Sequence, residues 1–91
     1  MAKFLAVHTL HAPAMPKEVT PFGKKAKAKT TVDAYWVRSW AQLNDEGKIV
    51  RIFCEWNAKD ADAVLKVMAQ VPELPLDGLY PMMIVDSEDF R

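Results

Sequence analysis

The chain has few of the residues that mark secreted, membrane-spanning or phosphate-binding proteins. Its 91 residues include a single cysteine, Cys54, so an internal disulfide is excluded and a reducing cytoplasm is suggested. No stretch approaches the ~18 apolar residues of a membrane-spanning helix. The segment from Met1 to His8 is too short and too soon interrupted to be a secretory signal. With three glycines, the chain also has no glycine-rich phosphate loop. We expect a cytoplasmic protein with no membrane partner.

An excess of charge of either sign is also absent. Twelve Lys and Arg residues balance twelve Asp and Glu residues, giving a formal net charge of zero. Such a chain has no overall attraction to nucleic acid or to an anionic membrane. The strand from Gly47 to Phe53 lacks the glycine and aromatic pattern of RNA-binding sheets. We therefore expect no nucleic-acid partner.

What the chain does have is the composition of a folded protein. Hydrophobic residues make up 51% and charged residues 26% of the sequence. Its length predicts one domain over residues 1–91, near the size at which oligomerisation often adds needed burial.

Hydrophobic patterning predicts four strands and two helices. The first strand covers Lys3 to Thr9, and a loop follows from His11 to Pro16. Thr20 and Pro21 mark the start of a first helix, on which Phe22 and Ala26 face the sheet. Asn57 is the predicted N-cap of the second helix, whose buried stripe comprises Ala61, Val64, Leu65, Met68 and Val71. Pro72 ends that helix, and the last strand covers Leu79 to Asp86.

The two central strands lie within Ala34 to Asn57 and form a hairpin around the loop Asn44 to Gly47. The element order is then β-α-β-β-α-β. It predicts an α+β, ferredoxin-like fold: a four-stranded antiparallel sheet with both helices on one face.

The sheet face without helices is the predicted functional surface. Period-two alternation groups Trp36 with Arg38 and Trp40, and pairing of Leu43 with Lys48 would set Trp36 beside Glu55. Aromatic side chains on this face predict a homodimer, because a large apolar surface seldom stays in contact with water. Two sheets would then pair into a dimeric α+β barrel. The candidate ligand-binding residues are Trp36, Arg38, Trp40, Arg51, Phe53 and Glu55.

Three short motifs in the chain resemble those of a known family. The motifs are Trp36-Val37-Arg38-Ser39-Trp40, Cys54-Glu55-Trp56 and Ala58-Lys59-Asp60. From Ala34 to Asp86 the chain is similar to the small ferredoxin-like proteins described as nickel-binding proteins, of the dimeric α+β barrel superfamily. The resemblance implies this fold, a homodimer and a nickel site. Arg38 stands where the family often has a histidine, and a guanidinium cannot bind a metal.

Two kinds of site are compatible with these residues. A divalent ion, nickel or zinc, needs neutral histidine or carboxylate ligands, and the candidates are His8, His11 and Glu55. The alternative is a small enzyme, monooxygenase-like or isomerase-like, in which His8 and Glu55 move protons and Arg38 fixes a small organic anion. Nothing indicates an organic cofactor. Cys54 is predicted to be a buried, inert thiol on the apolar face of its strand.

Overall fold

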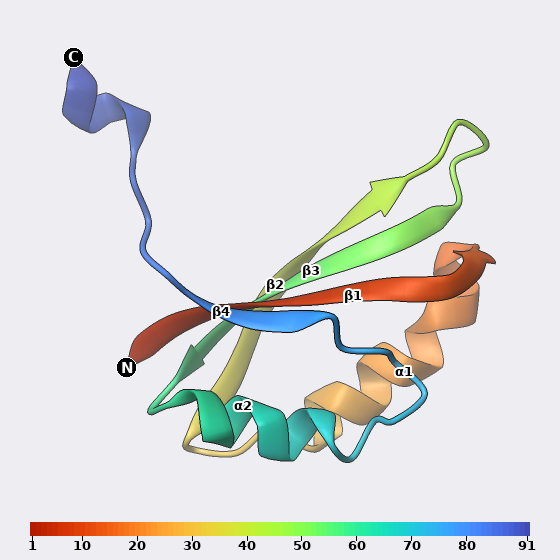
Figure 1. Ribbon diagram of the computed structural model, residues 1–91, viewed down its shortest axis with the longest axis horizontal. Helices are drawn as coiled ribbons and strands as arrows, with labels where there is room; N and C mark the ends of the chain where they lie inside the picture. The colour runs from red at the N-terminus through yellow and green to blue at the C-terminus, as the bar shows by residue number, and fades with distance from the viewer.

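The computed structural model describes all 91 residues and has the predicted element order (Figure 1). The strands and helices are β1 (Ala2–Ala14), α1 (Pro16–Ala28), β2 (Ala34–Leu43), β3 (Ile49–Ala58), α2 (Ala61–Met68) and β4 (Gly78–Met82), followed by a 3₁₀ turn at Ser87–Phe90. The strands form one sheet in the order β2-β3-β1-β4, and every neighbouring pair is antiparallel. Both helices lie against the same face. The predicted ferredoxin-like fold is confirmed.

The first strand and helix meet without the predicted loop. Strand β1 continues to Ala14, and its register against β3 shifts between Thr9 and Ala14. Helix α1 begins at Pro16, where a missing backbone N–H is harmless. The backbone N–H of Met15 donates to the Glu18 carboxylate at 2.9 Å, which fixes this end. Prediction of a Thr20 cap was therefore wrong, because an earlier proline already starts the helix.

The second helix also starts later than predicted. Asp60 is its N-cap and accepts from the Ala63 backbone N–H at 2.9 Å, whereas Asn57 belongs to β3 and pairs with Lys3 of β1. Val64, Met68 and Val71 of the predicted stripe are buried, whereas Leu65 is exposed and Ala63 and Val67 are buried in addition. The side chains buried against the sheet are those of Ala63, Val64, Val67, Met68 and Val71. Strand β4 ends at Met82, four residues before the predicted end at Asp86.

The core lies between this helix layer and the sheet. Trp56 of β3 is its largest fully buried side chain, and Val64 and Val67 of α2 are buried with it. The sheet contributes fully buried alanines at positions 6, 34 and 58. These small side chains let α2 approach the backbone closely, as the packing density of protein interiors requires.

The register of the central hairpin differs from the predicted one. Trp36 pairs with Trp56, but the next pair joins Arg38 to Glu55, so Val37 forms a β-bulge. The bulge turns Trp36 toward the helices, while Arg38 and Trp40 stay on the other face. The predicted neighbours Trp36 and Glu55 are thus on opposite faces of the sheet.

The hairpin loop lies where the sequence predicts it. The Asn44 N–H donates to the Lys48 carbonyl at 2.8 Å, and Gly47 has a φ of 78°, which favours glycine. Leu43 pairs with Ile49 and not with Lys48, so the loop is one residue longer than predicted.

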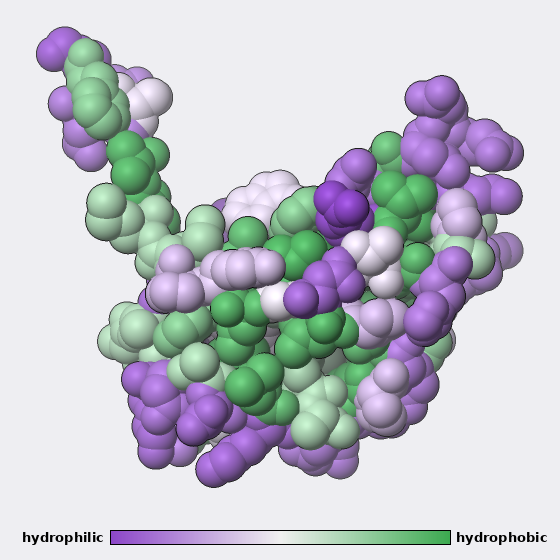
Figure 2. All heavy atoms as spheres, viewed as in Figure 1, coloured by the Kyte–Doolittle hydropathy of each residue, from purple (hydrophilic) through white to green (hydrophobic).

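After β4 the chain leaves the body of the molecule. Residues 83–91, which we call the C-terminal arm, rise on the side of the sheet away from the helices (Figure 1). Figure 2 shows apolar residues along the arm and polar residues at its tip. Neither helix is long and apolar enough to cross a membrane.

Candidate functional site

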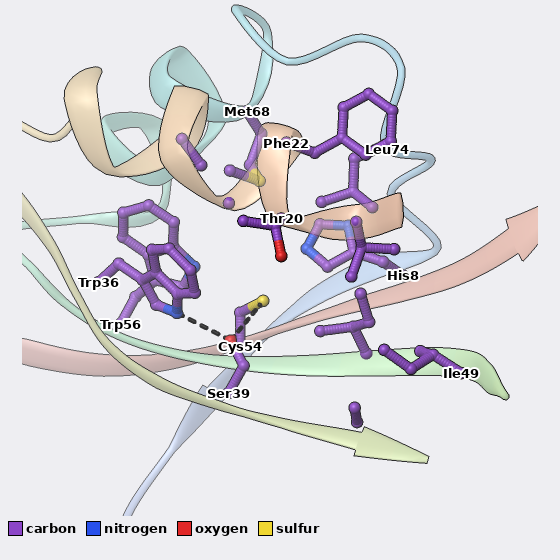
Figure 3. Close-up of a pocket in the computed structure, with 15 residues that line it drawn as sticks. His8, Thr20, Phe22, Trp36, Ser39, Ile49, Cys54, Trp56, Met68 and Leu74 are labelled. Atoms are coloured by element: carbon purple, nitrogen blue, oxygen red, sulfur yellow. Dashed lines mark hydrogen bonds between the residues drawn. The ribbon is translucent and has the colours of Figure 1, made fainter. Parts of the chain in front are cut away.

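A cavity of about 250 Å³ lies between α1 and the helix-covered face of the sheet (Figure 3). Helix α1 supplies one wall and the sheet the other, with Met68 of α2 and Leu74 closing one side. Eleven of its fifteen lining residues are hydrophobic, so the cavity favours an apolar occupant. The lining comprises His8, Val19, Thr20, Phe22, Gly23, Ala26, Trp36, Ser39, Ala41, Ile49, Ile52, Cys54, Trp56, Met68 and Leu74.

The cavity has a closed end and an accessible edge. His8, Cys54 and Trp56 are buried, and they belong to the two central strands β1 and β3. Ser39 and Ala41 are exposed and belong to β2, the edge strand beside α1. A small molecule can therefore enter between β2 and α1 and reach the buried residues.

His8 is the most polar group at the closed end. Its side chain is 0% exposed, and its Nδ1 lies 2.7 Å from the carbonyl oxygen of Pro75. A carbonyl only accepts hydrogen bonds, so Nδ1 carries the proton and donates it. Burial lowers the pKa of His8, opposed in part by this bond and by the Asp77 carboxylate. The imidazole is thus neutral at pH 7, and its Nε2 is a hydrogen-bond acceptor with no partner in the protein.

Trp56 presents the complementary group. Its indole Nε1 is buried and has no hydrogen-bond partner in the protein, although it can only donate. Leaving such a group unpaired in an apolar surrounding costs about 1–3 kcal/mol. His8 and Trp56 both belong to the lining of this chiefly hydrophobic cavity, and each has one buried ring nitrogen without a partner in the protein, an acceptor in His8 and a donor in Trp56.

The second indole of the cavity is already satisfied. Trp36 donates from Nε1 to the Ser39 hydroxyl at 2.8 Å, and Ser39 donates to Cys54 Sγ at 3.1 Å (Figure 3). This short chain fixes the Trp36 ring as a wall of the cavity. Burial raises the pKa of the Cys54 thiol, and the hydrogen bond from Ser39 opposes that shift. The thiol is protonated at pH 7, as an inert buried cysteine would be.

The open face of the sheet carries a separate polar cluster. Glu55 is nearly buried there, with Lys3 Nζ against one carboxylate oxygen and Arg38 Nε 3.2 Å from the other. Lys3 also donates to the Asn57 side chain at 2.7 Å. Both carboxylate oxygens of Glu55 are thus paired with cations of the same chain. A ligand could bind this carboxylate only by displacing Lys3 or Arg38.

The structure divides the predicted ligand-binding residues between the two faces. Arg38, Trp40, Arg51, Phe53 and Glu55 share the open face, as predicted. Trp36 does not, because the bulge at Val37 turns it into the cavity. Its predicted place on the open face was wrong.

The predicted metal ligands are not brought together. His8 pairs with Ile52 and points to the helices, whereas Glu55 pairs with Leu5 and points to the open face. His11 lies further along β1 and is exposed. No group of three or more His, Cys, Asp or Glu side chains is placed to hold a metal ion. The residues chosen from the sequence therefore do not fit a nickel or zinc site within one chain.

Several cavity residues were not predicted as functional. Trp56, Ser39 and Ile52 are among them, because each has the character of an ordinary strand residue in the sequence. Alternation along β1 does group Phe4, Ala6 and His8 on one face of the strand. The alternation does not tell which face the helices cover, because Leu5 and Val7 on the opposite face are apolar too.

Comparison with known proteins supports the fold and goes no further. The sequence matches no family model and no curated protein. The structure is similar to the crystal structure of SCO4226 from Streptomyces coelicolor A3(2), with a TM-score of 0.75 and 16% sequence identity. The similarity covers 93% of this chain and 100% of the other. At this identity the likeness establishes a shared α+β fold over nearly the whole chain.

Proposed function

We propose that the protein binds a small, mostly apolar organic molecule that carries a hydroxyl group, in the cavity beneath α1. The observation that carries this proposal is that two residues of a chiefly hydrophobic cavity lining, His8 and Trp56, each keep a buried ring nitrogen, Nε2 and Nε1, without a partner in the protein. Natural proteins seldom leave buried polar groups without partners.

The cavity volume limits the size of the ligand. A dry protein cavity of about 150 Å³ is enough to bind benzene. Drug-sized ligands occupy pockets of roughly 300–1,000 Å³. A cavity of about 250 Å³ therefore suits a molecule of one or two rings. Aromatic rings suit it best, because Trp36, Phe22 and Trp56 offer ring faces and edges for stacking.

The acceptor on His8 and the donor on Trp56 indicate the chemical class of the ligand. His8 Nε2 accepts, so it selects a ligand with an O–H or N–H donor. Trp56 Nε1 donates, so it selects a ligand with a lone pair. A hydroxyl oxygen supplies both kinds of group, and a phenol or an enol places them on a flat apolar frame. Arg38 and Arg51 are on the open face, so no cationic side chain lines the cavity to bind an anionic ligand.

Calorimetric titration with 2-naphthol and 2-methoxynaphthalene tests this proposal. The two probes share a ring system, but only 2-naphthol can donate to His8. We expect 2-naphthol to bind more tightly by about fivefold to tenfold, since a net hydrogen bond contributes about 1 kcal/mol. In a ¹⁵N–¹H spectrum the indole signals of Trp36 and Trp56 should shift, and that of Trp40 should not. No binding of either probe at millimolar concentration would contradict the proposal.

A pair of variants locates the binding site. Ala41→Phe places a large ring at the accessible edge of the cavity, where the exposed position tolerates it, and should weaken naphthol binding at least tenfold. Ala28→Phe makes the same change at an exposed position of α1 outside the lining and is the matched control. Equal affinities of the two variants would place the ligand elsewhere.

A second function, proton transfer on the bound molecule, is supported by the state of His8. A neutral imidazole that is held through Nδ1 and free at Nε2 has the arrangement of a general base. Bound beside it, a ketone would lose an α-proton to Nε2 and become an enolate, and return of a proton to carbon would restore the ketone. If the proton on Nε2 exchanges with D₂O before the return step, the ketone is regenerated with deuterium at its α-carbon and nothing else is consumed.

Exchange of 2-tetralone in D₂O separates this function from simple binding. Wild-type protein should accelerate deuterium incorporation at the α-carbon beyond the buffer rate, and His8→Leu should abolish the acceleration. Binding of 2-naphthol without any accelerated exchange would leave a binding protein and eliminate the catalytic function.

A further inference from the structure

Helix α1 covers the cavity, but little of the helix is buried. Of its thirteen residues, Ala26 is the one that is buried. Val19 and Thr20 in the first half line the cavity, and Figure 3 shows the Thr20 side chain pointing from the helix toward the other lining residues. The first half of α1 thus lies over a cavity and not over a packed core, so burial contributes little to holding it in place.

The sequence of α1 divides into a weak half and a strong half. The segment Val19-Thr20-Pro21-Phe22-Gly23 combines β-branched residues with a proline and a glycine, which are all poor helix formers. The segment that follows, Lys24-Lys25-Ala26-Lys27-Ala28, consists of alanine and lysine, which are among the best helix formers. The first half of such a helix can open while the second half stays intact.

Pro21 weakens the middle of the helix. It is the sixth residue of α1, and it has no N–H to donate to the carbonyl of Lys17. The hydroxyl of Thr20 donates to the Pro16 carbonyl at 3.0 Å, and a contact of this kind tends to bend a helix. Gly23 follows two residues after the proline and adds backbone freedom. These features together place a hinge at residues 21–23.

Contacts between α1 and distant parts of the chain lie on its second half. Lys25 forms an ion pair with Glu73, with 2.8 Å between Nζ and Oε1. Lys27 Nζ lies 4.0 Å from the centre of the Tyr35 ring and donates to the Trp36 carbonyl at 3.4 Å. By contrast, the side-chain hydrogen bonds of the first half stay within the helix and its cap. The first half can therefore move without breaking the contacts that anchor the second.

We propose that residues 16–20, which we call the lid, swing away from the sheet about the hinge at residues 21–23 and admit the ligand to the cavity. The proposal rests on the proposed function, because it describes how a ligand reaches that site. In the closed state Val19 and Thr20 cover the lining. In the open state the gap between α1 and the edge strand β2 widens. Segments that gate a binding site belong to the least stable parts of a fold, and the lid is such a part.

Labelling of Cys54 with N-ethylmaleimide tests the lid without any ligand. Cys54 is buried in the lining, so the reagent reaches it when the lid opens or when the whole protein unfolds. Global unfolding depends steeply on urea, whereas opening of a short segment exposes little surface and responds weakly. We expect the labelling rate to be nearly independent of urea at low concentration. A rate that follows global unfolding at every urea concentration would overturn the proposal.

Pro21→Ala changes the hinge at a position outside the lining. It supplies the N–H that the Lys17 carbonyl lacks and so stabilises the closed state. Labelling of Cys54 at low urea should slow by about tenfold or more, since proline is the least favourable residue within a helix. Pro13→Ala is the matched control, because Pro13 is exposed in β1 and also lies outside the lining. Equal labelling rates in the two variants would refute the hinge.

Amide hydrogen exchange of the ligand-free protein gives an independent measurement. The amides of Phe22 and Gly23 bond across the hinge in an α-helix, and they should exchange about tenfold or more faster than those of Ala26 and Lys27. Equal protection of the two pairs would overturn the lid. Circular dichroism reports whether each variant is folded. If Pro21→Ala is not, Gly23→Ala changes the same hinge and should slow labelling in the same direction.

The kinetics of 2-naphthol binding separate the lid from the binding function. In Pro21→Ala, stopped-flow fluorescence should show association and dissociation slowed by the same factor of about tenfold, with an unchanged dissociation constant, because the closed state is stabilised with and without ligand. A changed dissociation constant with an unchanged association rate would overturn the lid. Failure of 2-naphthol to bind would contradict the proposed function alone, and labelling and exchange would still decide whether the lid opens.

Discussion

Replacement of His8 by leucine should remove a specific pH dependence of stability. His8 is fully buried, and burial lowers its pKa below the ordinary value of about 6.5. In the unfolded chain the same imidazole titrates normally. Between its folded and unfolded pKa values, the unfolded state therefore binds one more proton than the folded state.

The sign and the size of the effect follow from that proton. Stability contributed by the neutral imidazole is fully present above the unfolded pKa and is lost as the pH falls toward the folded one. The slope is at most about 1.4 kcal/mol per pH unit, so the loss from pH 6.5 to pH 5 is at most about 2 kcal/mol. Asp77 faces the ring and reduces the shift, and it remains in the variant.

His8→Leu also changes stability at neutral pH. It removes the hydrogen bond from Nδ1 to the Pro75 carbonyl and leaves that half-buried oxygen without its partner. We expect a loss of about 1–3 kcal/mol at pH 7. Because the variant has no imidazole that gains a proton on unfolding, its disadvantage should shrink at pH 5 by up to about 2 kcal/mol.

Urea denaturation at pH 5, 6, 7 and 8, followed by tryptophan fluorescence, measures these differences. His11→Leu is the matched control, since it removes an exposed histidine from the same strand. The free energy of unfolding could instead depend on pH in the same way in the wild type and in His8→Leu. That result would show that His8 is not kept neutral by burial in the folded protein. The acceptor that the proposed ligand requires would then be missing too.

Three other predictions follow from the cavity and its surroundings. Cys54 should react slowly with a thiol reagent in the native protein and fast in denaturant; rapid stoichiometric labelling of the native protein would contradict its buried position. Gly23→Ala should raise the free energy of unfolding by roughly 0.5–1 kcal/mol, because an added methyl meets Trp36 at an ordinary 3.6 Å in a helix interior; a lower thermal midpoint would show that the helix cannot accept it. Ni²⁺ titrated into the wild type and into His8→Ala should give the same heat, since His8, His11 and Glu55 do not converge; a large loss in the variant would restore His8 as a metal ligand.

The fold was predictable because its signals are local and repeated. Alternating side chains identify each strand, the Asn44 to Gly47 segment identifies the hairpin loop, and the stripe containing Val64 and Met68 identifies the second helix. The order of these elements then leaves few topologies open. Exact element ends were less predictable, because Thr20 and Pro16, or Asn57 and Asp60, compete as helix starts and the wider packing chooses between them.

The candidate site was predictable only in part. Five of the six predicted ligand-binding residues share the open face, because period-two alternation survives from Arg38 onward. The cavity itself was not predictable. Its lining combines residues from three strands, both helices and the loop before β4, and no spacing in the sequence relates Thr20 to Cys54 or Leu74.

The sequence by itself determined that this chain forms a single α+β sheet with two helices, because the strand and helix periods are properties of neighbouring residues. Tertiary structure decided where Trp36 and His8 point. With Trp36 and Trp40 four residues apart, regular alternation would place both rings on one face, and a single bulged residue at Val37 separates them. Packing of Trp36 beneath α1 next to Gly23 accompanies that bulge, and such packing exists only when distant segments meet. The packing of these segments also places His8 under the helices, where Nδ1 contacts the Pro75 carbonyl and Nε2 has no partner in the protein.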